Sequence, residues 1–312
     1  MHSAGVMTRP LILLTGASGQ LGFELAHLLR AHATITAADR AALDLSDADA
    51  IVSAVRSAKP DLIVNAGAFT AVDLAESQTE VAFAVNARAP GVLAEEAKRS
   101  GAMLIHYSTD YVFDGTSDTP YDETAATNPM SVYGASKLAG EEAVGSTNAQ
   151  ALIFRTSWVY GLRGKNFLLT IKRLAAERPE LRIVDDQTGT PNWSRTLAHA
   201  TAVVIARGLP YLAERTGLYH LSCTGATTWY EFARAIVARG AKMPSSNAPA
   251  PRVVPIATED YPTPARRPAY AVLSTRKFTA VFGETLPDWR EALAACLSST
   301  SPVDTMSAQP RD

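Results

Sequence analysis

Short runs of apolar residues alternate along this chain with longer segments that mix apolar and polar positions. In the first half, the short runs predict strands at residues 11–14, 34–38, 62–65, 103–107 and 152–155. The segments between them predict helices at about residues 20–31, 49–59, 81–99 and 133–142. Continuous apolar strands with helices between them are typical of a parallel sheet covered on both faces. The pattern therefore predicts an α/β fold with a doubly wound parallel sheet.

The pattern loosens after about residue 155. It predicts short strands at residues 181–184 and 218–221, and helices at residues 194–206, 228–239 and 288–297. Residues 244–268 are rich in proline and are expected to be largely loop. We expect one part of this second half to return to the sheet and the other part to build a smaller, interleaved unit over the edge of the sheet.

A glycine-rich loop, Gly16-Ala17-Ser18-Gly19-Gln20-Leu21-Gly22, separates the first predicted strand from the first predicted helix. Glycines at this spacing permit a tight turn and a close approach of the backbone to a ligand. The N-terminus of the helix offers N–H donors to a pyrophosphate. The motif alone is weak, but its place between a strand and a helix is that of a Rossmann-type dinucleotide-binding domain. Its expected cofactor contacts are Gly16, Gly19, Gln20, Leu21 and Gly22.

These predictions divide the chain into two domains. Residues 7–155, together with about 195–225, are expected to form the dinucleotide-binding domain. Residues from about 156 to 194, together with 226–298, are expected to form a substrate domain. Residues 299–312 are rich in Ser, Thr, Pro and Asp and are expected to be a disordered tail.

Two adjacent residues leave the choice between NADH and NADPH open. Asp39 closes the second predicted strand, where a carboxylate commonly binds the ribose hydroxyls of NADH. Arg40 follows it, and a guanidinium can pair with the 2′-phosphate of NADPH. Asp44 and Leu45 lie where a loop can reach the adenine, and the small residues Ala66-Gly67-Ala68 follow the third strand.

Candidate catalytic residues lie around the fourth predicted strand. Tyr133 and Lys137 are four residues apart in a predicted helix, so both project from one face. A phenol can donate or accept a proton, and a neighbouring ammonium stabilises the phenolate. A third group, Thr109 or Ser108, lies at the end of the strand, and ligands of open α/β sheets bind outside the carboxyl ends of the strands. With the glycine-rich loop, this set predicts hydride chemistry on a carbonyl or hydroxyl group.

Composition and charge narrow the classes of partner. The 312 residues are 47% hydrophobic and 19% charged, which is typical of a folded protein with a sizeable core. A net charge of −2 gives no general attraction to nucleic acid or to an anionic membrane, so neither is expected as a partner. The six histidines include no His-x-x-x-His pair, so a catalytic zinc site is not expected.

The compartment is predicted from the cysteines and from the apolar runs. Cys223 and Cys296 have no metal-ligand spacing and are expected to be thiols in a reducing compartment. The first ten residues lack the apolar centre of a signal peptide, and no apolar run has the length of a membrane span. A soluble cytoplasmic protein is therefore expected.

Several longer motifs carry a resemblance to a known family. The most specific are residues 108–115, residues 155–161 around Trp158, and Asp186-Gln187-Thr188-Gly189-Thr190-Pro191. These are far more specific than the glycine-rich loop at residues 15–22. The other matching stretches are residues 65–76, 133–141, Arg267-Pro268 and 273–275. Together they resemble the extended short-chain dehydrogenase/reductase superfamily and, within it, the dTDP-4-dehydrorhamnose reductase family. The resemblance spans roughly residues 10–298.

The resemblance implies a reaction and a role for each site residue. The 4-keto group of dTDP-4-dehydro-L-rhamnose would be reduced to give dTDP-L-rhamnose, with hydride from NADH or NADPH. Tyr133 would donate a proton to O4, Lys137 would lower the phenol's pKa from about 10, and Thr109 would align the carbonyl. Asp110 and Trp158 match sugar-contacting positions of the family. The positions that would line the cofactor are Ala68, Phe69, Thr70, Tyr107, Tyr133 and Lys137.

Two further features concern the substrate's charge and a metal. Candidate cations for the diphosphate are Arg163, Lys165, Arg252, Arg266 and Arg267. Some relatives join two subunits through Mg²⁺ held by glutamates, and Glu24 fits one such position, but Arg195 stands at the other. A guanidinium cannot ligate Mg²⁺, so we expect no metal here and a monomer or a weak homodimer.

Three other functions are weighed against the reductase. A 4,6-dehydratase shares the loop and the Tyr-Lys pair, but it needs a further carboxylic acid where Tyr111 follows Thr109-Asp110. An epimerase of nucleotide sugars is harder to exclude, because it would differ mainly in keeping its cofactor bound. A non-catalytic regulatory subunit that binds NAD(P) is the third alternative, and the presence of Thr109, Tyr133 and Lys137 argues against it.

Overall fold

A computed structural model of the chain describes residues 9–240 and 250–299. These residues form a parallel six-stranded sheet with the strand order β10-β5-β4-β3-β1-β2. Its strands are β1 (Leu11–Thr15), β2 (Thr34–Ala38), β3 (Leu62–Asn65), β4 (Met103–Thr109), β5 (Ala151–Thr156) and β10 (Gly217–His220). The predicted strands are confirmed, and the return of one late strand to the sheet is confirmed as well.

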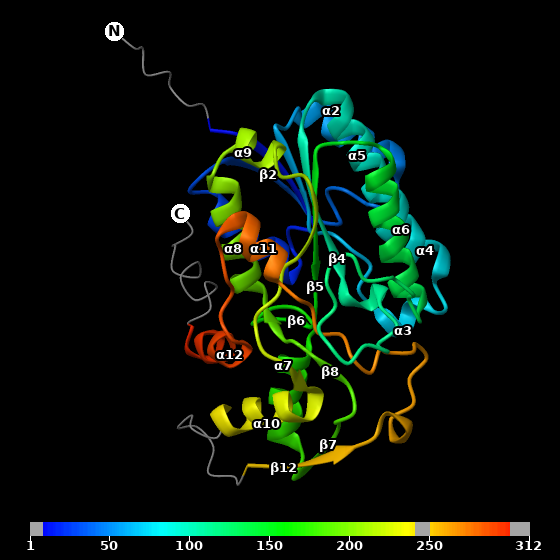
Figure 1. The fold of residues 1–312 in the computed structure, drawn as a ribbon, viewed down its shortest axis with the longest axis vertical. Helices are drawn as coiled ribbons and strands as arrows, with labels where there is room; N and C mark the ends of the chain where they lie inside the picture. Colours follow the sequence, from blue (N-terminus) through cyan, green and yellow to red (C-terminus); the bar gives the residue numbers. More distant parts are fainter. Residues whose placement is uncertain (1–8, 241–249, 300–312) are drawn as a thin grey trace, which may run out of the picture.

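Helices cover both faces of the sheet (Figure 1). One face carries α1 (Gln20–Leu29), α8 (Ser194–Ala206), α9 (Leu209–Ala213) and α11 (Arg276–Phe282). The other carries α2 (Ala48–Ala58), α4 (Thr79–Phe83), α5 (Ala89–Ser100) and α6 (Val132–Ser146). The chain thus has the doubly wound α/β architecture that the sequence predicts.

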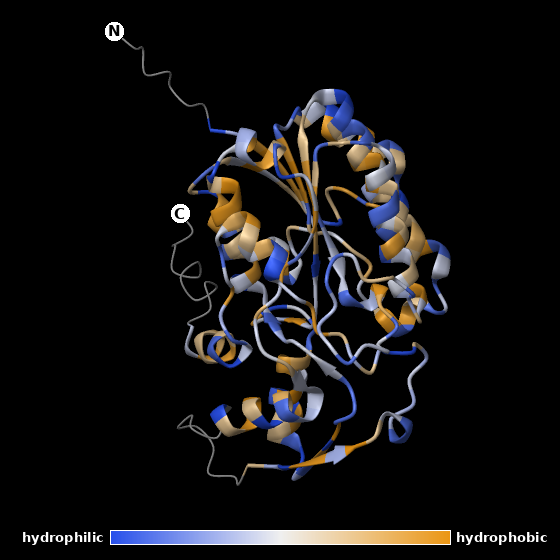
Figure 2. Ribbon diagram, in the orientation of Figure 1, coloured by the Kyte–Doolittle hydropathy of each residue, from blue (hydrophilic) through white to orange (hydrophobic). Residues whose placement is uncertain are grey.

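Two apolar clusters fill the space between the sheet and its helices. The larger contains Leu14, Ile105 and Phe154 and packs under α1 and α8, and the second contains Leu13, Ile63 and Leu104 and packs under α2 and α5. In Figure 2 the strands of the sheet are largely orange, that is, hydrophobic. The sheet therefore has buried faces on both sides, which explains why its strands are continuous apolar runs.

The long helix predicted at residues 81–99 is in fact interrupted. The chain forms α4, then a π-helical turn at Ala84–Arg88, and then α5, with Pro90 in the first turn of α5. Asn86 of this turn bonds the backbone of Phe69 twice, at 2.8 Å and 3.0 Å, and donates to Ser136 Oγ at 3.0 Å. The interruption thus ties the loop after β3 to α6.

A smaller unit lies at the carboxyl edge of the sheet (Figure 1). It contains α7 (Phe167–Glu177) and α10 (Trp229–Gly240), with β7 (Glu180–Val184) paired in parallel to β12 (Arg252–Ile256). The loop prediction for residues 244–268 is therefore wrong at β12 and at a 3₁₀ turn, Thr258–Asp260. Residues 241–249 lie outside the described part. Pro255 favours the prediction of a loop, because proline is rare inside strands. β12 tolerates it because the strand belongs to a two-stranded ribbon, where a missing N–H is tolerated.

Several short elements and one further helix complete the described residues. They are α3 (Val72–Ala75), a 3₁₀ turn at Asp110–Val112, β6 (Val159–Tyr160), β8 (Thr188–Gly189), β9 (Asn192–Trp193), β11 (Thr227–Thr228) and α12 (Trp289–Ser298). β6 pairs with β9, and β8 pairs with β11. The division into two domains at the stated boundaries stays a prediction. The tail predicted at residues 299–312 falls outside the described residues except for Ser299.

Candidate active site

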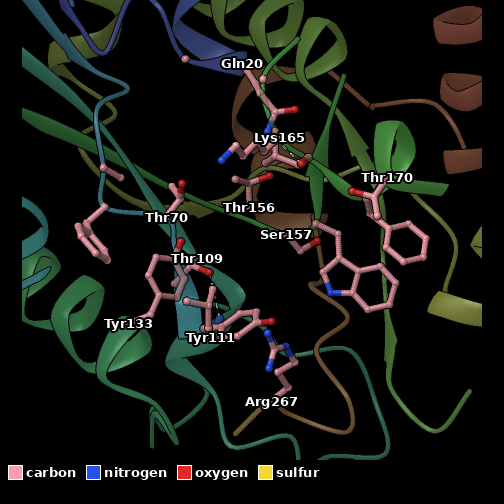
Figure 3. A pocket seen from close by; sticks show the side chains of 18 of the residues that line it. Gln20, Thr70, Thr109, Tyr111, Tyr133, Thr156, Ser157, Lys165, Thr170 and Arg267 are labelled. Carbon is pink, nitrogen blue, oxygen red and sulfur yellow. Dashed lines mark hydrogen bonds between the residues drawn. The ribbon is translucent and has the colours of Figure 1, made fainter. Parts of the chain in front are cut away.

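A cleft of about 1270 Å³ opens at the carboxyl edge of the sheet. Its walls come from the glycine-rich loop, the end of β4, the start of α6 and the smaller unit. In Figure 3, Thr109, Tyr111 and Tyr133 lie together with Arg267 close by, and Gln20 and Lys165 lie on the opposite side. The cleft therefore brings the predicted catalytic residues to the predicted cofactor loop.

The glycine-rich loop packs directly on the loop after β3. Gly16 has φ +66°, and a Cβ placed there would lie 2.5 Å from the Cα of Gly67. A Cβ on Gly22 would lie 2.1 Å from the carbonyl oxygen of Gly16. Gly19 precedes α1, and among the described residues no side chain caps that helix. The loop thus leaves backbone N–H groups at the start of α1 for an anion, which fits a dinucleotide pyrophosphate.

The structure separates the predicted cofactor residues into two groups. Most line the cleft: Gly16, Gly19, Gln20, Leu21, Arg40, Asp44, Leu45, Ala68, Phe69, Thr70, Tyr107, Tyr133 and Lys137. Gly22 instead packs beneath the loop. Asp39 does not line the cleft. Its Oδ1 accepts hydrogen bonds from the N–H groups of Ala41 and Ala42, both at 3.0 Å. Of the two residues from which the cofactor preference is predicted, Arg40 lines the cleft and Asp39 does not.

The predicted catalytic residues meet where β4 ends and α6 begins. Thr109 Oγ1 donates to Asp110 Oδ1 at 3.0 Å and accepts from the N–H of Tyr111 at 3.2 Å. The start of α6 is fixed by Ser131, whose Oγ accepts from the N–H of Gly134 at 3.1 Å. Tyr133, in the first turn of that helix, contacts the edge of the Tyr111 ring with the centroids 5.5 Å apart.

Burial shapes the proton chemistry of this group. It raises the pKa of Tyr133 to about 12, and a hydrogen bond with Thr109 opposes that rise. Burial lowers the pKa of Lys137 to about 8, against the attraction of Glu141. It raises the pKa of Asp110 to about 7. Tyr133 is thus a protonated phenol across the neutral range, whereas Lys137 and Asp110 titrate close to neutrality.

Lys137 is held from below by β4. Its Nζ donates to the carbonyl oxygen of Tyr107 at 2.5 Å and lies 3.3 Å from Nε2 of His106. The lysine is only 2% exposed. Tyr107 points its own hydroxyl to Thr201 of α8, 2.7 Å away, on the opposite face of the sheet. Lys137 Nζ is therefore held against β4 by contacts that the Tyr-Lys spacing alone does not reveal.

Both predicted sugar-contacting residues, Asp110 and Trp158, line the cleft. Asp110 is buried, and its Oδ2 has no hydrogen-bond partner among the described residues. Trp158 has φ +40° and stacks on Trp229 with the ring centroids 3.5 Å apart. A Cβ on residue 189 would lie 2.5 Å from the indole of Trp158, so only glycine fits at position 189. Sequence reasoning missed Trp229, which is at the start of an ordinary amphipathic helix.

The candidate cations differ in their access to the cleft. Lys165 and Arg267 line it, and Arg267 is held there by Asp73 at 2.8 Å. Arg163, Arg252 and Arg266 do not line the cleft. The guanidinium of Arg163 stacks over the ring of Phe23 at 3.8 Å, and that of Arg252 lies 3.8 Å from the carboxylate of Glu180. Two cations of the smaller unit that the sequence did not single out, Arg178 and Arg182, also line it.

Comparisons with known proteins agree with this geometry. The family model described as the RmlD substrate binding domain matches residues 9–301. A dTDP-4-dehydrorhamnose reductase of Burkholderia thailandensis is 49% identical over 290 residues, which are 92% of this chain and 97% of the relative. The chain belongs to the dTDP-4-dehydrorhamnose reductase family. The resemblance carried by the sequence motifs is thereby confirmed.

Solved structures of the dTDP-4-dehydrorhamnose reductase family share the whole fold. One from Clostridium acetobutylicum has a TM-score of 0.85 at 35% identity and covers 95% of this chain and 99% of its own. Another, from Bacillus anthracis in complex with NADP, has a TM-score of 0.84 at 34% identity and covers 94% of this chain and 100% of its own. The predicted fold class is confirmed.

In this chain, Glu24 forms an ion pair with a residue of the same chain. Its carboxylate accepts hydrogen bonds from Arg195 at 2.8 Å and 3.3 Å. The described residues contain no group of three or more His, Cys, Asp or Glu side chains placed to hold a metal ion. In the same part of the chain, no helix has the length and apolar character of a membrane span.

Proposed function

We propose that this chain reduces the 4-keto group of dTDP-4-dehydro-L-rhamnose to give dTDP-L-rhamnose, with NADPH or NADH as the hydride source. One observation carries the proposal. Thr109, Tyr133 and Lys137 converge at the end of β4, in a cleft whose other wall is the glycine-rich loop. A carbonyl placed there reaches a proton donor and a hydride donor at once, as carbonyl reduction requires.

The residues of this chain divide the work. When bound, the nicotinamide supplies hydride to C4 of the sugar. Thr109 fixes the carbonyl oxygen, and Tyr133 donates the proton that O4 needs. The high pKa of Tyr133, about 12 because of burial, keeps its proton in place until the oxygen becomes basic. Lys137 stabilises the phenolate and then returns a proton to it.

Recognition of the substrate is assigned to other residues that line the cleft. Asp110 offers a buried carboxyl oxygen without a partner among the described residues, which suits a sugar hydroxyl. Trp158, which stacks on Trp229, offers an aromatic surface to the sugar. Lys165 and Arg267 line the same cleft and suit the diphosphate, because charge-assisted hydrogen bonds to phosphate are strong.

Location and assembly are part of the proposal as well. Cys223 and Cys296 are both free thiols, which is typical of reducing compartments and supports a cytoplasmic enzyme. The pairing of Glu24 with Arg195 inside the chain supports a monomer or a weak homodimer. Sedimentation of the purified protein over a range of concentrations tests the assembly.

The function is tested by mixing the purified protein with NADPH or NADH and dTDP-4-dehydro-L-rhamnose, and by following the nicotinamide absorbance. We expect oxidation that depends on the sugar. Tyr133→Phe should abolish turnover and leave cofactor binding intact, because the ring stays and only the proton donor is lost. If neither cofactor is oxidised by the wild-type protein, the reductase proposal is wrong.

The same assay separates the remaining alternatives. An epimerase would interconvert sugars without net oxidation of added cofactor, and the nicotinamide would stay bound through purification. A regulatory subunit would bind the cofactor but show no turnover with any nucleotide sugar.

A further inference from the structure

A row of buried polar side chains crosses three adjacent strands of the sheet, near their carboxyl ends. Thr15 of β1 is paired in register with Asn65 of β3, and Asn65 is paired with His106 of β4. None of the three is more than 1% exposed. The row ends at Lys137, because Nε2 of His106 lies 3.3 Å from its Nζ. Polar groups in such a place are costly unless each has a partner, so the row needs an explanation.

The row has a direction. Thr15 Oγ1 donates to Asn65 Oδ1 at 2.6 Å, so the amide nitrogen of Asn65 faces Nδ1 of His106, at 3.0 Å, as a donor. Nδ1 therefore accepts. Burial, and then the neighbouring Lys137, hold the pKa of His106 well below its usual value, so the ring is neutral and carries one proton. That proton lies on Nε2, and the N–H points at Nζ of Lys137.

We propose that His106 is a positioning residue that donates its Nε2–H to the amine of Lys137 and so stabilises the form of the lysine that has just given up a proton beside Tyr133. The proposal rests on the proposed function. A donor aimed at Nζ favours a nitrogen with a free lone pair and disfavours an ammonium. The carbonyl of Tyr107 accepts from Nζ in either form and keeps it in place.

The proton balance is simple. As hydride adds to C4 and nicotinamide is oxidised, the O–H bond of Tyr133 breaks and its proton goes to O4. An N–H bond of the Lys137 ammonium then breaks, and its proton passes through a bridging water to restore the phenol. A neutral amine remains, which accepts the hydrogen bond from His106. Solvent returns the proton to Lys137 before the next turnover.

The neighbouring carboxylate of Glu141 favours the charged form of Lys137, but it is already paired with an arginine. Glu141, one turn further along α6, favours the ammonium. Its carboxylate is bound by Arg155 of β5 through two hydrogen bonds of 2.8 Å and 2.6 Å. Residue 153 of β5, which is in register with His106, is an apolar isoleucine. Within the described part of the chain, His106 is thus the side chain in hydrogen-bond reach of Nζ.

The tautomer of His106 can be measured without substrate. Nitrogen-15 NMR of the histidine-labelled protein with bound cofactor reports which ring nitrogen carries the proton, and His106→Gln identifies the signal. We expect protonated Nε2 and unprotonated Nδ1 across the neutral range. Protonated Nδ1 would overturn the proposal, because His106 would then accept from an ammonium. This readout is independent of whether the sugar is reduced.

The pH profile of kcat/KM gives the second test. Activity should fall as the pH rises through the pKa of Lys137, and His106→Leu should move that fall upward by about one pH unit, a tenfold change in proton affinity. His106→Gln, which can still offer an N–H, should restore the profile in part. Ile153→Val is the matched buried control and should leave it unchanged. A downward shift, or no shift in a folded His106→Leu protein, would overturn the proposal.

Discussion

The guanidinium of Arg195, on α8, lies 2.8 Å from the carboxylate of Glu24, on α1. The Glu24 side chain is only 8% exposed, and Arg195 is 27% exposed and also lies over the ring of Trp193 at 5.1 Å. Two helices that cover the same face of the sheet are thus joined next to the cofactor loop. Glu24, which the family resemblance marks as a possible magnesium ligand, instead forms an ion pair inside this chain.

Removing the cation alone should destabilise the protein. Arg195→Met leaves the buried carboxylate of Glu24 without a partner, and we expect a loss of about 1–3 kcal/mol in the free energy of unfolding. Adding Glu24→Gln to it should recover most of that loss. Urea unfolding of the three proteins measures both effects, and equal stability of wild type and Arg195→Met would refute the argument.

Cofactor preference should depend on Arg40. This residue lines the cleft, whereas the carboxylate of Asp39 is engaged by the backbone of its own loop. Arg40→Ala should raise the KM for NADPH by about 10–100-fold, the value of a charge-assisted contact to phosphate, and leave the KM for NADH nearly unchanged. Steady-state kinetics with both cofactors measures this, and an equal loss for the two would show that Arg40 does not contact the 2′-phosphate.

Asp110 should make stability depend on pH. Burial raises its pKa to about 7 in the folded protein, whereas the unfolded chain ionises near the ordinary value of 3.8. Between these values only the folded state holds the proton, so stability falls as the pH rises toward 7 and stays lower above it. Asp110→Asn should therefore be more stable than wild type at alkaline pH, with the gain shrinking as the pH falls toward 4. A pH-independent difference in the free energy of unfolding would contradict the shift.

Substrate affinity should depend on Trp229 through Trp158. The two indoles stack face to face at 3.5 Å, with Trp158 in a left-handed backbone conformation. Trp229→Ala should raise the KM for the nucleotide sugar about 3–10-fold, with kcat and cofactor affinity little changed, because stacked pairs contribute about 0.5–1.5 kcal/mol beyond their buried area. Trp229→Phe keeps an aromatic face and serves as the control. An unchanged KM in the alanine variant would mean that the stack does not support the sugar site.

The sheet was predictable from sequence because its signals are local. Runs such as residues 62–64 are buried on both sides, so each is apolar throughout, and the glycines of the loop are required by its own backbone. Tyr133 and Lys137 are one helical turn apart, and their shared face follows from that spacing alone.

Features that depend on distant partners could not be predicted. β12 pairs with β7, about seventy residues earlier, and its own sequence, which contains Pro255, shows no clear alternation. The use of Asp39 by its own loop, the stack of Trp229 on Trp158 and the row from Thr15 to Lys137 are all set by tertiary placement. His106 gave one signal, a titratable residue inside an apolar strand, but its partner is visible only in the fold.

Transfer of deuteride tests the central claim most directly. The wild-type protein is incubated with NADPH that carries deuterium at the transferred position of its nicotinamide and with dTDP-4-dehydro-L-rhamnose, and the product is analysed by mass spectrometry and NMR. The account predicts dTDP-L-rhamnose with one deuterium, at C4, and no product from Tyr133→Phe. Product without deuterium at C4, or with the 4-keto group intact, would contradict it.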